Sequence, residues 1–280
     1  ETASRLGPTS DVTDDGGVRH RLWQLPVDDP ALGPLAAALL EAGAAGPLTI
    51  ADGHHRYETA LRYHDERHRD RQRCELAPFD YLLALLVPVD QPLTVLPTHR
   101  VLRDGLAGEA LVTAAGALFD VELLPERSAL LSVFARGTGG AADRRDDLPP
   151  AERPHRIGLW TGDLAAVLRA RADAFEPLLD PTGSPYLRWL DVSLLAVALE
   201  RLLGVDRAAT AGGGRLAYTQ DPVEALELVD RGEASSAFLL DPTPVADVLR
   251  VAAAGEVMPP KSTYFYPKQL TGLVLNPHEW

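Results

Sequence analysis

The stretch Ile50-Ala51-Asp52-Gly53-His54-His55-Arg56-Tyr57-Glu58 decides the fold of the chain. Pro47 to Ala51 form an apolar run typical of a buried strand, and Asp52-Gly53 is a common turn dipeptide. After the turn, Tyr57 and Leu61 recur four residues apart with polar residues between them, which is the pattern of an amphipathic helix. The sequence therefore predicts a strand that enters a helix through a glycine turn.

The predicted turn gathers reactive side chains at the start of that helix. Free backbone N–H groups and the positive end of the helix dipole make such a position suitable for anions. Asp52, His54, His55 and Arg56 add a carboxylate, two imidazoles and a guanidinium, which together can bind phosphate and carry protons. The alternative is that Asp52 caps the helix and that Arg56 pairs with a neighbouring acid.

The same helix, which we expect to continue to about Arg71, carries two further histidines. His64 and His68 are four residues apart and could chelate a metal ion. Because no third ligand stands in register with them, the sequence favours a solvated helix face and predicts no metal site.

Composition limits the classes of protein to which the chain can belong. With 280 residues, 46% of them apolar, it can form one large or two ordinary domains. The formal charge of -13 argues against a nucleic-acid surface. The longest uncharged apolar stretch, Tyr81 to Val89, is far shorter than the ~20 residues of a membrane helix. Cys74 is the only cysteine, which excludes an internal disulfide and is consistent with a cytoplasmic protein.

The C-terminal region holds both lysines of the chain, Lys261 and Lys268. The segment before Lys261 has the outline of a P-loop, but Pro259 and Pro260 remove two of the N–H donors that such a loop needs, so a P-loop ATPase is rejected. The prolines instead fix the backbone ahead of Lys261 and its two hydroxyl neighbours, which favours a substrate or phosphate contact. The alternative is an edge strand with its lysines at the surface.

Four stretches together resemble the signatures of the domain of unknown function ten-fifteen family. They are Ile50 to Leu61, Leu96 to Arg100, Leu190 to Ser193 and Met258 to Lys268, and the resemblance runs in order from about residue 17 to residue 275. The glycine-turn segment of that family is similar to the phosphate-binding turn of ParB/sulfiredoxin-like proteins, including free serine kinases. The resemblance implies a mixed α/β (α+β) fold, with a ParB/sulfiredoxin-like strand, turn and helix followed by a C-terminal α/β layer.

Alternating polarity and helix caps predict the remaining elements. Strands are expected at residues 18–25, 79–89, 93–102, 121–124, 156–160, 165–169, 216–219 and 237–240, and helices at residues 30–42, 106–117, 128–135, 186–203, 221–230 and 244–253. Residues 79–102 and 156–169 should each form a hairpin, although residues 164–168 also fit a helix. The alternation of strands and helices after residue 215 indicates an α/β layer.

These elements predict three parts in the chain. Residues 1–16 lack periodicity and are expected to be a flexible terminus. Residues 17–136 form the signature domain, and residues 155–280 form a C-terminal α/β domain beyond a disordered loop at residues 137–154. Relatives in the family carry a segment ahead of residue 17, so the resemblance implies that the signature domain is incomplete here.

A second group of candidate residues lies at Thr98-His99-Arg100. If the predicted hairpin pairs beside the signature strand, as the resemblance implies, His99 and Arg100 face the same pocket as His54 and Arg56. The residues alone fit a sheet-edge histidine and an ion-paired arginine equally well.

Together the motifs predict a small-molecule kinase that transfers a phosphoryl group from ATP or ADP, with Mg²⁺, to a serine-like hydroxyl. Asp52 or His54 accepts the hydroxyl proton or helps to hold Mg²⁺. The expected phosphate- and nucleotide-binding residues are Gly53, His55, Arg56, His99, Arg100, Lys261, Ser262, Thr263 and Lys268.

Two other classes of function stay open. One is a nucleotide- or metabolite-binding regulator without turnover. The resemblance implies that acidic residues from the family's upstream segment take part in catalysis, and this segment is expected to be missing here. The other is a ParB-like nucleotide hydrolase. In all three classes the expected partners are a nucleotide and a small polar metabolite, and neither nucleic acid nor a membrane is expected.

Overall fold

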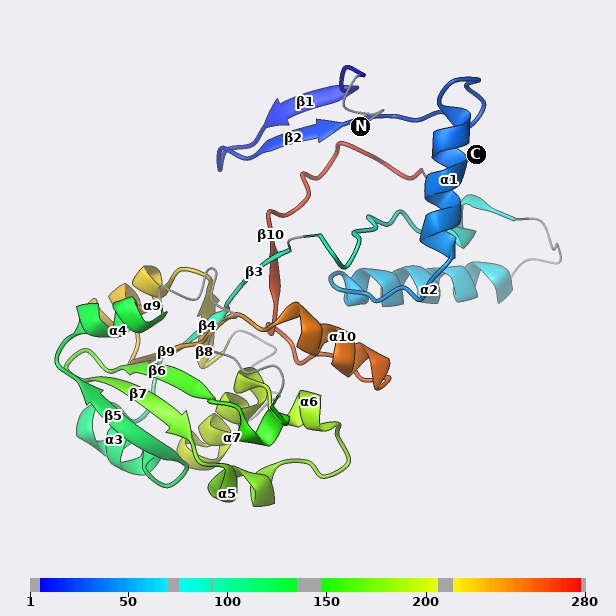
Figure 1. The fold of residues 1–280 in the computed structure, drawn as a ribbon. Helices are drawn as coiled ribbons and strands as arrows, with labels where there is room; N and C mark the ends of the chain where they lie inside the picture. Colours follow the sequence, from blue (N-terminus) through cyan, green and yellow to red (C-terminus); the bar gives the residue numbers. More distant parts are fainter. Residues whose placement is uncertain (1–5, 70–75, 92, 135–147, 206–213, 278–280) are drawn as a thin grey trace. The chain divides into compact units, whose positions relative to one another are not determined.

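The computed structural model describes residues 6–69, 76–91, 93–134, 148–205 and 214–277. They form a mixed α/β fold, as predicted (Figure 1). The chain divides into two compact units, of which the first is made of residues 1–92 and 267–280 and the second of residues 93–266. Among the described residues, no helix has both the length and the apolar character that crossing a bilayer requires.

Within its described residues, the first unit has one hairpin, two α-helices and one 3₁₀ helix. Strand β1 (Ser10–Thr13) pairs antiparallel with β2 (Arg19–Leu22), so part of the segment that lacked periodicity in the sequence forms a strand. Helix α1 (Gly33–Ala44) begins three residues after the expected proline, because the Asp29 carboxylate accepts hydrogen bonds from the Ala31 and Leu32 amides in a turn ahead of it. Helix α2 (His54–Arg69) is followed by the 3₁₀ helix Pro78–Asp80.

Two strands expected in the first unit are not formed. Residues 47–51 and 81–88 have no ladder partner among the described residues. Their apolar side chains are exposed, for example Leu48 at 68% and Leu85 at 62%. The predictions were wrong because an apolar run becomes a strand only where a neighbouring segment supplies its hydrogen bonds.

The second unit contains a six-stranded sheet in the order β5-β7-β6-β9-β4-β8, and every neighbouring pair is antiparallel. Its strands are β4 (His99–Leu102), β5 (Phe119–Leu124), β6 (Arg156–Trp160), β7 (Ala165–Ala170), β8 (Leu216–Thr219) and β9 (Ser236–Leu239). The predicted β6–β7 hairpin is confirmed, which excludes the helical alternative for residues 165–168. The predicted boundary between residues 136 and 155 falls inside this unit, where β5 and β7 lie side by side.

The other predicted hairpin, at residues 79–102, is wrong. Residues 93–102 divide at Pro97 into β3 (Thr94–Leu96) and β4. Pro97 has no N–H to donate to a ladder, so one continuous central strand is unfavourable here. β3 instead pairs antiparallel with β10 (Tyr264–Tyr266) in a separate two-stranded sheet, while β4 lies between β8 and β9. The C-terminal motif therefore includes a short strand.

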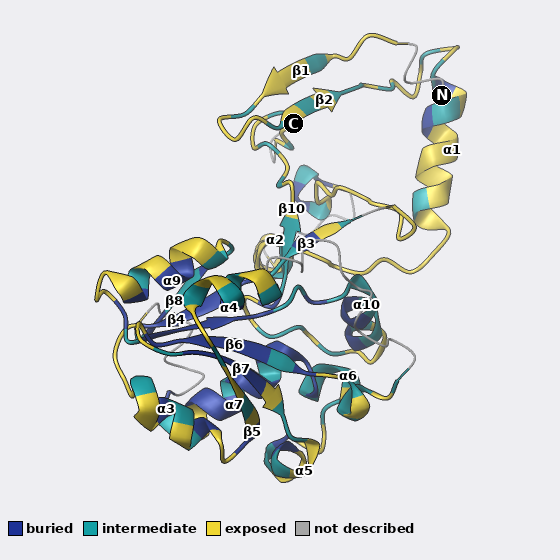
Figure 2. Ribbon diagram, turned by 60° about the vertical axis from the view of Figure 1, so that its left-hand side comes forward, coloured by how far each residue is buried: buried dark blue, intermediate teal, exposed yellow. Residues whose placement is uncertain are grey.

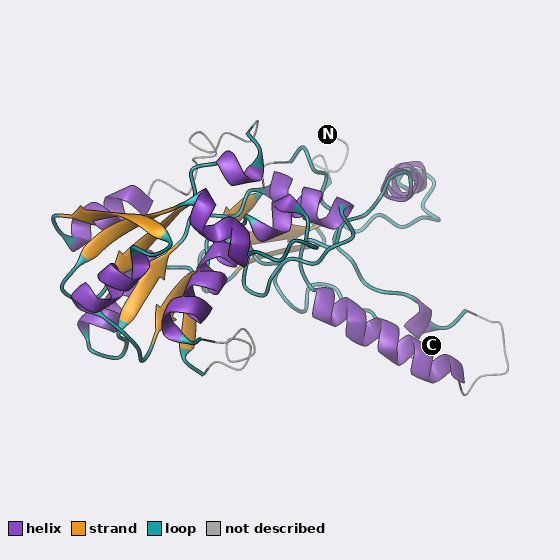
Figure 3. Cartoon of the chain, turned by 90° about the horizontal axis from the view of Figure 1, so that it is seen from below, coloured by secondary structure: helices purple, strands orange, loops and turns teal. Residues whose placement is uncertain are grey.

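Helices cover both faces of the six-stranded sheet (Figures 1 and 3). One face packs against α3 (Gly108–Ala115) and α7 (Asp191–Leu203), and the other against α4 (Arg127–Phe134) and α9 (Pro222–Asp230). The strands β4, β6 and β7 between them are largely buried (Figure 2). The other α-helices in the described part of this unit are α5 (Ala172–Phe175), α6 (Pro185–Arg188) and α10 (Val245–Ala253), and the 3₁₀ helix Glu176–Leu178 follows α5.

The predicted helix at residues 186–203 is interrupted. The chain leaves helical geometry at Leu190, which separates α6 from α7. The end of α7 agrees with the prediction, because Gly204 takes a left-handed conformation with φ +60° and closes the helix. Of the predicted loop at residues 137–154, Pro150–Glu152 form a 3₁₀ helix and residues 137–147 lie outside the described part of the chain.

Gly158 in β6 is a test of how tightly the sheet packs against α4. A Cβ at this position would lie 2.7 Å from Phe134 Cε2 and 3.0 Å from both Leu130 Cδ1 and Leu239 Cβ. Gly158→Ala should therefore lower the free energy of unfolding by about 1–3 kcal/mol through overpacking. Gly183→Ala, where the added Cβ would lie 3.6 Å from Glu256 Oε1, should change it by less than about 0.5 kcal/mol in the same urea titration. Equal stability of the two variants would contradict the packing.

Candidate functional site

The glycine turn and its helix form as the sequence predicted. α2 begins at His54, directly after Asp52-Gly53. Gly53 has φ +84°, in the left-handed region where glycine carries no steric penalty. The Gly53 amide donates to Asp52 Oδ1 at 2.8 Å, and its carbonyl accepts from the Tyr57 amide at 2.9 Å. The Asp52 carboxylate thus lies at the start of the helix.

Two cations approach this carboxylate. Lys268 Nζ donates to Asp52 Oδ2 at 2.7 Å, and Arg56 Nη2 lies 3.9 Å from the same oxygen. The Arg56 guanidinium lies over the turn, because a Cβ on Gly53 would be 3.0 Å from its Nη2. Lys268 and Asp52 both belong to the first unit although 216 positions separate them in the chain.

The Asp52 carboxylate is held in its charged form. Partial burial opposes ionisation, but the hydrogen bond and charge of Lys268, the Gly53 amide and the charge of Arg56 outweigh it, so the pKa of Asp52 lies below its usual value. The arginine side chain is 79% exposed and the lysine side chain 38%. Both cations are therefore accessible to a ligand from solution.

Two histidines complete the group in the first turn of α2. The rings of His54 and His55 are tilted against each other with centroids 4.1 Å apart, and His55 Nδ1 lies 3.5 Å from Glu58 Oε2. The first amides of a helix have no carbonyl partner within it. The turn therefore combines free N–H donors, two cations and two imidazoles around one carboxylate, which is an arrangement suited to an anion.

The other predicted residues lie in the second unit, where Arg100 organises them. Its side chain is buried, Nη1 donates to the Thr98 carbonyl, and Nη2 donates to the Lys261 carbonyl at 3.0 Å. The guanidinium also lies 5.7 Å from the centre of the Tyr218 ring. No acid of the described residues pairs with it, so the ion-paired alternative does not hold. Burial lowers the pKa of Arg100 to about 10.

The Lys261 turn is held by hydrogen bonds from side chains to its backbone carbonyls. Lys261 takes a left-handed conformation with φ +61°, which is uncommon for a residue with a side chain. The buried Ser262 hydroxyl donates to the Pro259 carbonyl, and the Ser262 carbonyl accepts from Thr243 Oγ1 at 2.9 Å. The Lys261 side chain remains exposed and Thr263 is half-buried.

His99 lies on β4, which has a neighbour on each side, so the sheet-edge alternative is wrong. The ring is buried, and Nδ1 accepts a hydrogen bond from the Leu240 amide at 3.2 Å. Nε2 then carries the proton and has no partner among the described residues. Burial, with the charge of Arg100, lowers the pKa of His99 to about 4. The ring is therefore neutral at physiological pH.

The predicted site residues thus fall into two groups, each assembled within its own unit. Asp52, Gly53, His54, His55, Arg56 and Lys268 belong to the first unit, and His99, Arg100, Lys261, Ser262 and Thr263 to the second. A pocket shared by both groups stays a prediction.

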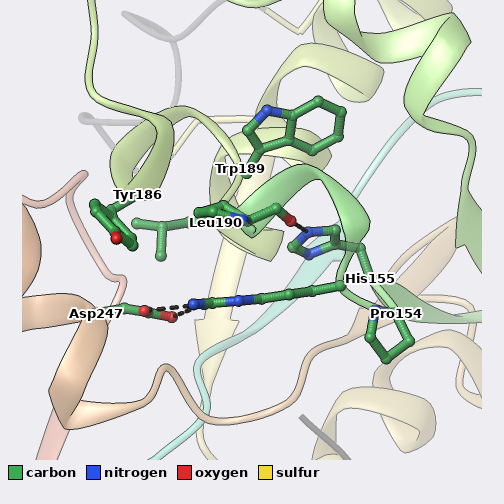
Figure 4. Close-up of a pocket in the computed structure, with 8 residues that line it drawn as sticks. Pro154, His155, Tyr186, Trp189, Leu190 and Asp247 are labelled. Atoms are coloured by element: carbon green, nitrogen blue, oxygen red, sulfur yellow. Dashed lines mark hydrogen bonds and ion pairs between the residues drawn. The ribbon is translucent and has the colours of Figure 1, made fainter. Parts of the chain in front are cut away.

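A small pocket in the second unit contains residues that sequence reasoning missed (Figure 4). His155 Nδ1 lies 2.7 Å from Asp191 Oδ1 and its Nε2 lies 2.7 Å from the Pro150 carbonyl, while Arg153 Nη1 lies 3.0 Å from both carboxylate oxygens of Asp247. Asp191 could have been noticed, because it lies in one of the four family-like stretches. The contact with His155 holds the start of α7, and the contact with Arg153 holds the first turn of α10.

Sequence reasoning also missed Asp80. Its carboxylate lies 2.6 Å from His68 Nε2 and 3.5 Å from His64 Nε2. The helical spacing of the two histidines was visible in the sequence, but the third group lies in a separate 3₁₀ helix and has no fixed register with them.

The family model described as "Protein of unknown function (DUF1015)" matches residues 1–193, and the chain belongs to this family. No curated protein matches the chain.

Three solved structures are similar over part of the chain. A conserved hypothetical protein from Pyrococcus furiosus has 14% identity and a TM-score of 0.38, covering 77% of this chain and 68% of its own. A free serine kinase in complex with AMP has 15% identity and a TM-score of 0.36, and a mutant of a free serine kinase in complex with AMP has 14% and 0.34. In both kinase comparisons the alignment covers 65% of this chain and 57% of the other chain.

The lowered pKa of His99 predicts how stability depends on pH. The folded ring stays neutral down to about pH 4, whereas the unfolded ring takes up a proton near pH 6.5. Between these values the unfolded state binds more protons, so stability falls as the pH falls, by about 3 kcal/mol in total from this residue.

His99→Asn keeps an acceptor for the Leu240 amide but does not titrate. The difference between the unfolding free energies of the parent and the variant, measured in urea from pH 7 to pH 4, should shrink towards low pH. A constant difference would show that His99 titrates normally in the folded state.

Proposed function

We propose that the protein transfers a phosphoryl group from a nucleotide to a hydroxyl of a small, serine-like acceptor, as a small-molecule kinase. The observation that carries the proposal is the convergence of Lys268 and Arg56 on the Asp52 carboxylate at the start of α2. In phosphoryl transfer, positioning and charge neutralisation supply most of the acceleration. The turn offers both.

The phosphates bind to Arg56, Lys268 and the first amides of α2. Arginine matches two phosphate oxygens with its planar fork, and lysine adds a point charge. A nucleotide phosphate carries more negative charge than a carboxylate, so the two cations shift from Asp52 towards it when the nucleotide binds. Gly53 allows this close approach because it has no side chain.

When the two cations leave the Asp52 carboxylate, it becomes able to accept a proton from the acceptor hydroxyl. The acceptor oxygen attacks the terminal phosphorus, the bond from that phosphorus to the nucleotide oxygen breaks, and the hydroxyl proton passes to Asp52 or to His54. Mg²⁺ fits here as a partner of the nucleotide, because such ions are held by one or two carboxylates together with phosphate oxygens. It would neutralise charge on the phosphates.

The predicted phosphate-binding residues of the second unit form a turn of their own. Lys261 has an exposed ammonium group, and Thr263 is half-buried beside it. Arg100 holds the Lys261 backbone through its carbonyl. Arg100 and Ser262 thus support the turn that carries Lys261 and Thr263.

An activity assay separates kinase, hydrolase and sensor. The protein is incubated with ATP, ADP or CTP and Mg²⁺, with and without free serine, and phosphoserine and free phosphate are measured. We expect phosphoserine that forms only with serine present and disappears in Asp52→Asn. Free phosphate without serine would favour a nucleotide hydrolase. Ligand-dependent melting with neither product would favour a regulator without turnover.

Arg56→Ala tests the phosphate contact separately from turnover. It should reduce the stabilisation that the nucleotide gives to the protein by about 1.5–3 kcal/mol, because a charge-assisted contact is lost. Arg62→Ala, an exposed arginine of the same helix, should leave this stabilisation unchanged. Thermal melting with and without nucleotide measures both. An unchanged shift in Arg56→Ala would remove Arg56 from the site.

A further inference from the structure

A second polar cluster lies in the C-terminal half of α2 and in the 3₁₀ helix that follows. His64 and His68 are one helical turn apart, and their ring centroids lie 4.4 Å from each other. Asp80 Oδ1 is 2.6 Å from His68 Nε2 and 3.5 Å from His64 Nε2. One ligand atom from each of the three residues can be chosen so that all lie within 4.8 Å of one another.

Neighbouring contacts orient these side chains. Asp80 Oδ2 accepts from the Ala77 amide at 2.6 Å, which leaves Oδ1 facing both histidines. His64 Nδ1 lies 3.1 Å from Asp65 Oδ1, so a proton held there leaves the lone pair of Nε2 free. A histidine that donates one ring N–H to a carboxylate and offers the other nitrogen is the usual arrangement around protein-bound metals.

The His68 ring is also held in place, while solvent still reaches the cluster. Phe79 packs edge-on against it with centroids 5.5 Å apart. The side chains of His64 and His68 are 37% and 36% exposed, whereas that of Asp80 is 9% exposed. An ion from solution can therefore approach from the side of the histidines.

The distances from Asp80 to the two histidines are close to those around a tetrahedral ion. Ligands about 2.0–2.1 Å from Zn²⁺ lie about 3.3–3.5 Å from one another at the corners of a tetrahedron. The separation of His64 Nε2 and Asp80 Oδ1 is already 3.5 Å. The shorter contact between His68 and Asp80 is a hydrogen bond, which lengthens by less than about 1 Å when an ion replaces its proton.

We propose that His64, His68 and Asp80 form a binding site for one divalent transition-metal ion, with Zn²⁺ as the preferred ion and water in the remaining position. Two imidazoles and one carboxylate favour Zn²⁺ over Mg²⁺ and Ca²⁺, which take oxygen ligands. The site is separate from any Mg²⁺ that accompanies a nucleotide at Asp52. Metal binding joins the end of α2 to the 3₁₀ helix and stabilises the first unit.

The test is Zn²⁺ binding to the full chain without an affinity tag, measured by titration calorimetry. Cys74, which lies outside the described residues, is first changed to serine so that its thiol does not contribute. This parent should bind one equivalent of Zn²⁺ and melt at a higher temperature with it. His64→Ala, His68→Ala and Asp80→Asn should each lower the affinity more than about 100-fold, because loss of a ligand exceeds the effect of losing an outer contact.

His20→Ala is the matched control, because His20 pairs with Asp14 at 2.9 Å in the same unit but, among the described residues, belongs to no group of three possible ligands. It should bind Zn²⁺ as the parent does. Co²⁺ gives a second readout, since its visible absorption reports ligand geometry and should be lost in His64→Ala, while circular dichroism verifies that the helices remain. Absence of stoichiometric binding in the parent, or parent-like affinity in either Asp80→Asn or His64→Ala, would overturn the three-residue site.

Discussion

The ion pair between Lys268 and Asp52 is the constraint on which the candidate site depends. It links the C-terminal segment of the first unit to the glycine turn across 216 positions of sequence. Exposed ion pairs contribute only about 0–1 kcal/mol, so this contact adds little to stability. Its importance is positional, because it places an ammonium group beside the Arg56 guanidinium at a helix start. The turn alone would offer one cation.

Local signals in the sequence predicted much of the fold. The glycine turn, the start of α2, the hairpin of β6 and β7 and the Gly204 helix end each depend on residues close together in the chain. The strands expected at residues 47–51 and 79–89 failed because strand formation depends on a distant partner, which an apolar run does not identify. The separation of β3 from β4 at Pro97 follows from the missing N–H of this residue. The strand-like pattern on both sides of Pro97 led to the prediction of one continuous strand.

The candidate site was likewise predictable where its residues are close together in the sequence, and less so where they come from distant segments. Asp52 to Arg56 are neighbours in sequence, so their chemistry could be seen directly. Lys268 was a candidate only through its family-like motif and the rarity of lysine. Asp80 was missed as a partner of His64 and His68, because helical periodicity ends with the helix. Arg100 was expected either to bind phosphate or to pair with an acid, and its carbonyl partners come from a turn that no local pattern could place.

The antiparallel pairing of β3 and β10 has a consequence for the history of the chain. These strands are the first and last elements of the 93–266 unit, so the entry and exit of that unit lie side by side. A segment with adjacent ends can be gained, lost or exchanged as one block while its host keeps its own connections. The second unit has the architecture of an insertion, and the two units can therefore have had separate evolutionary origins.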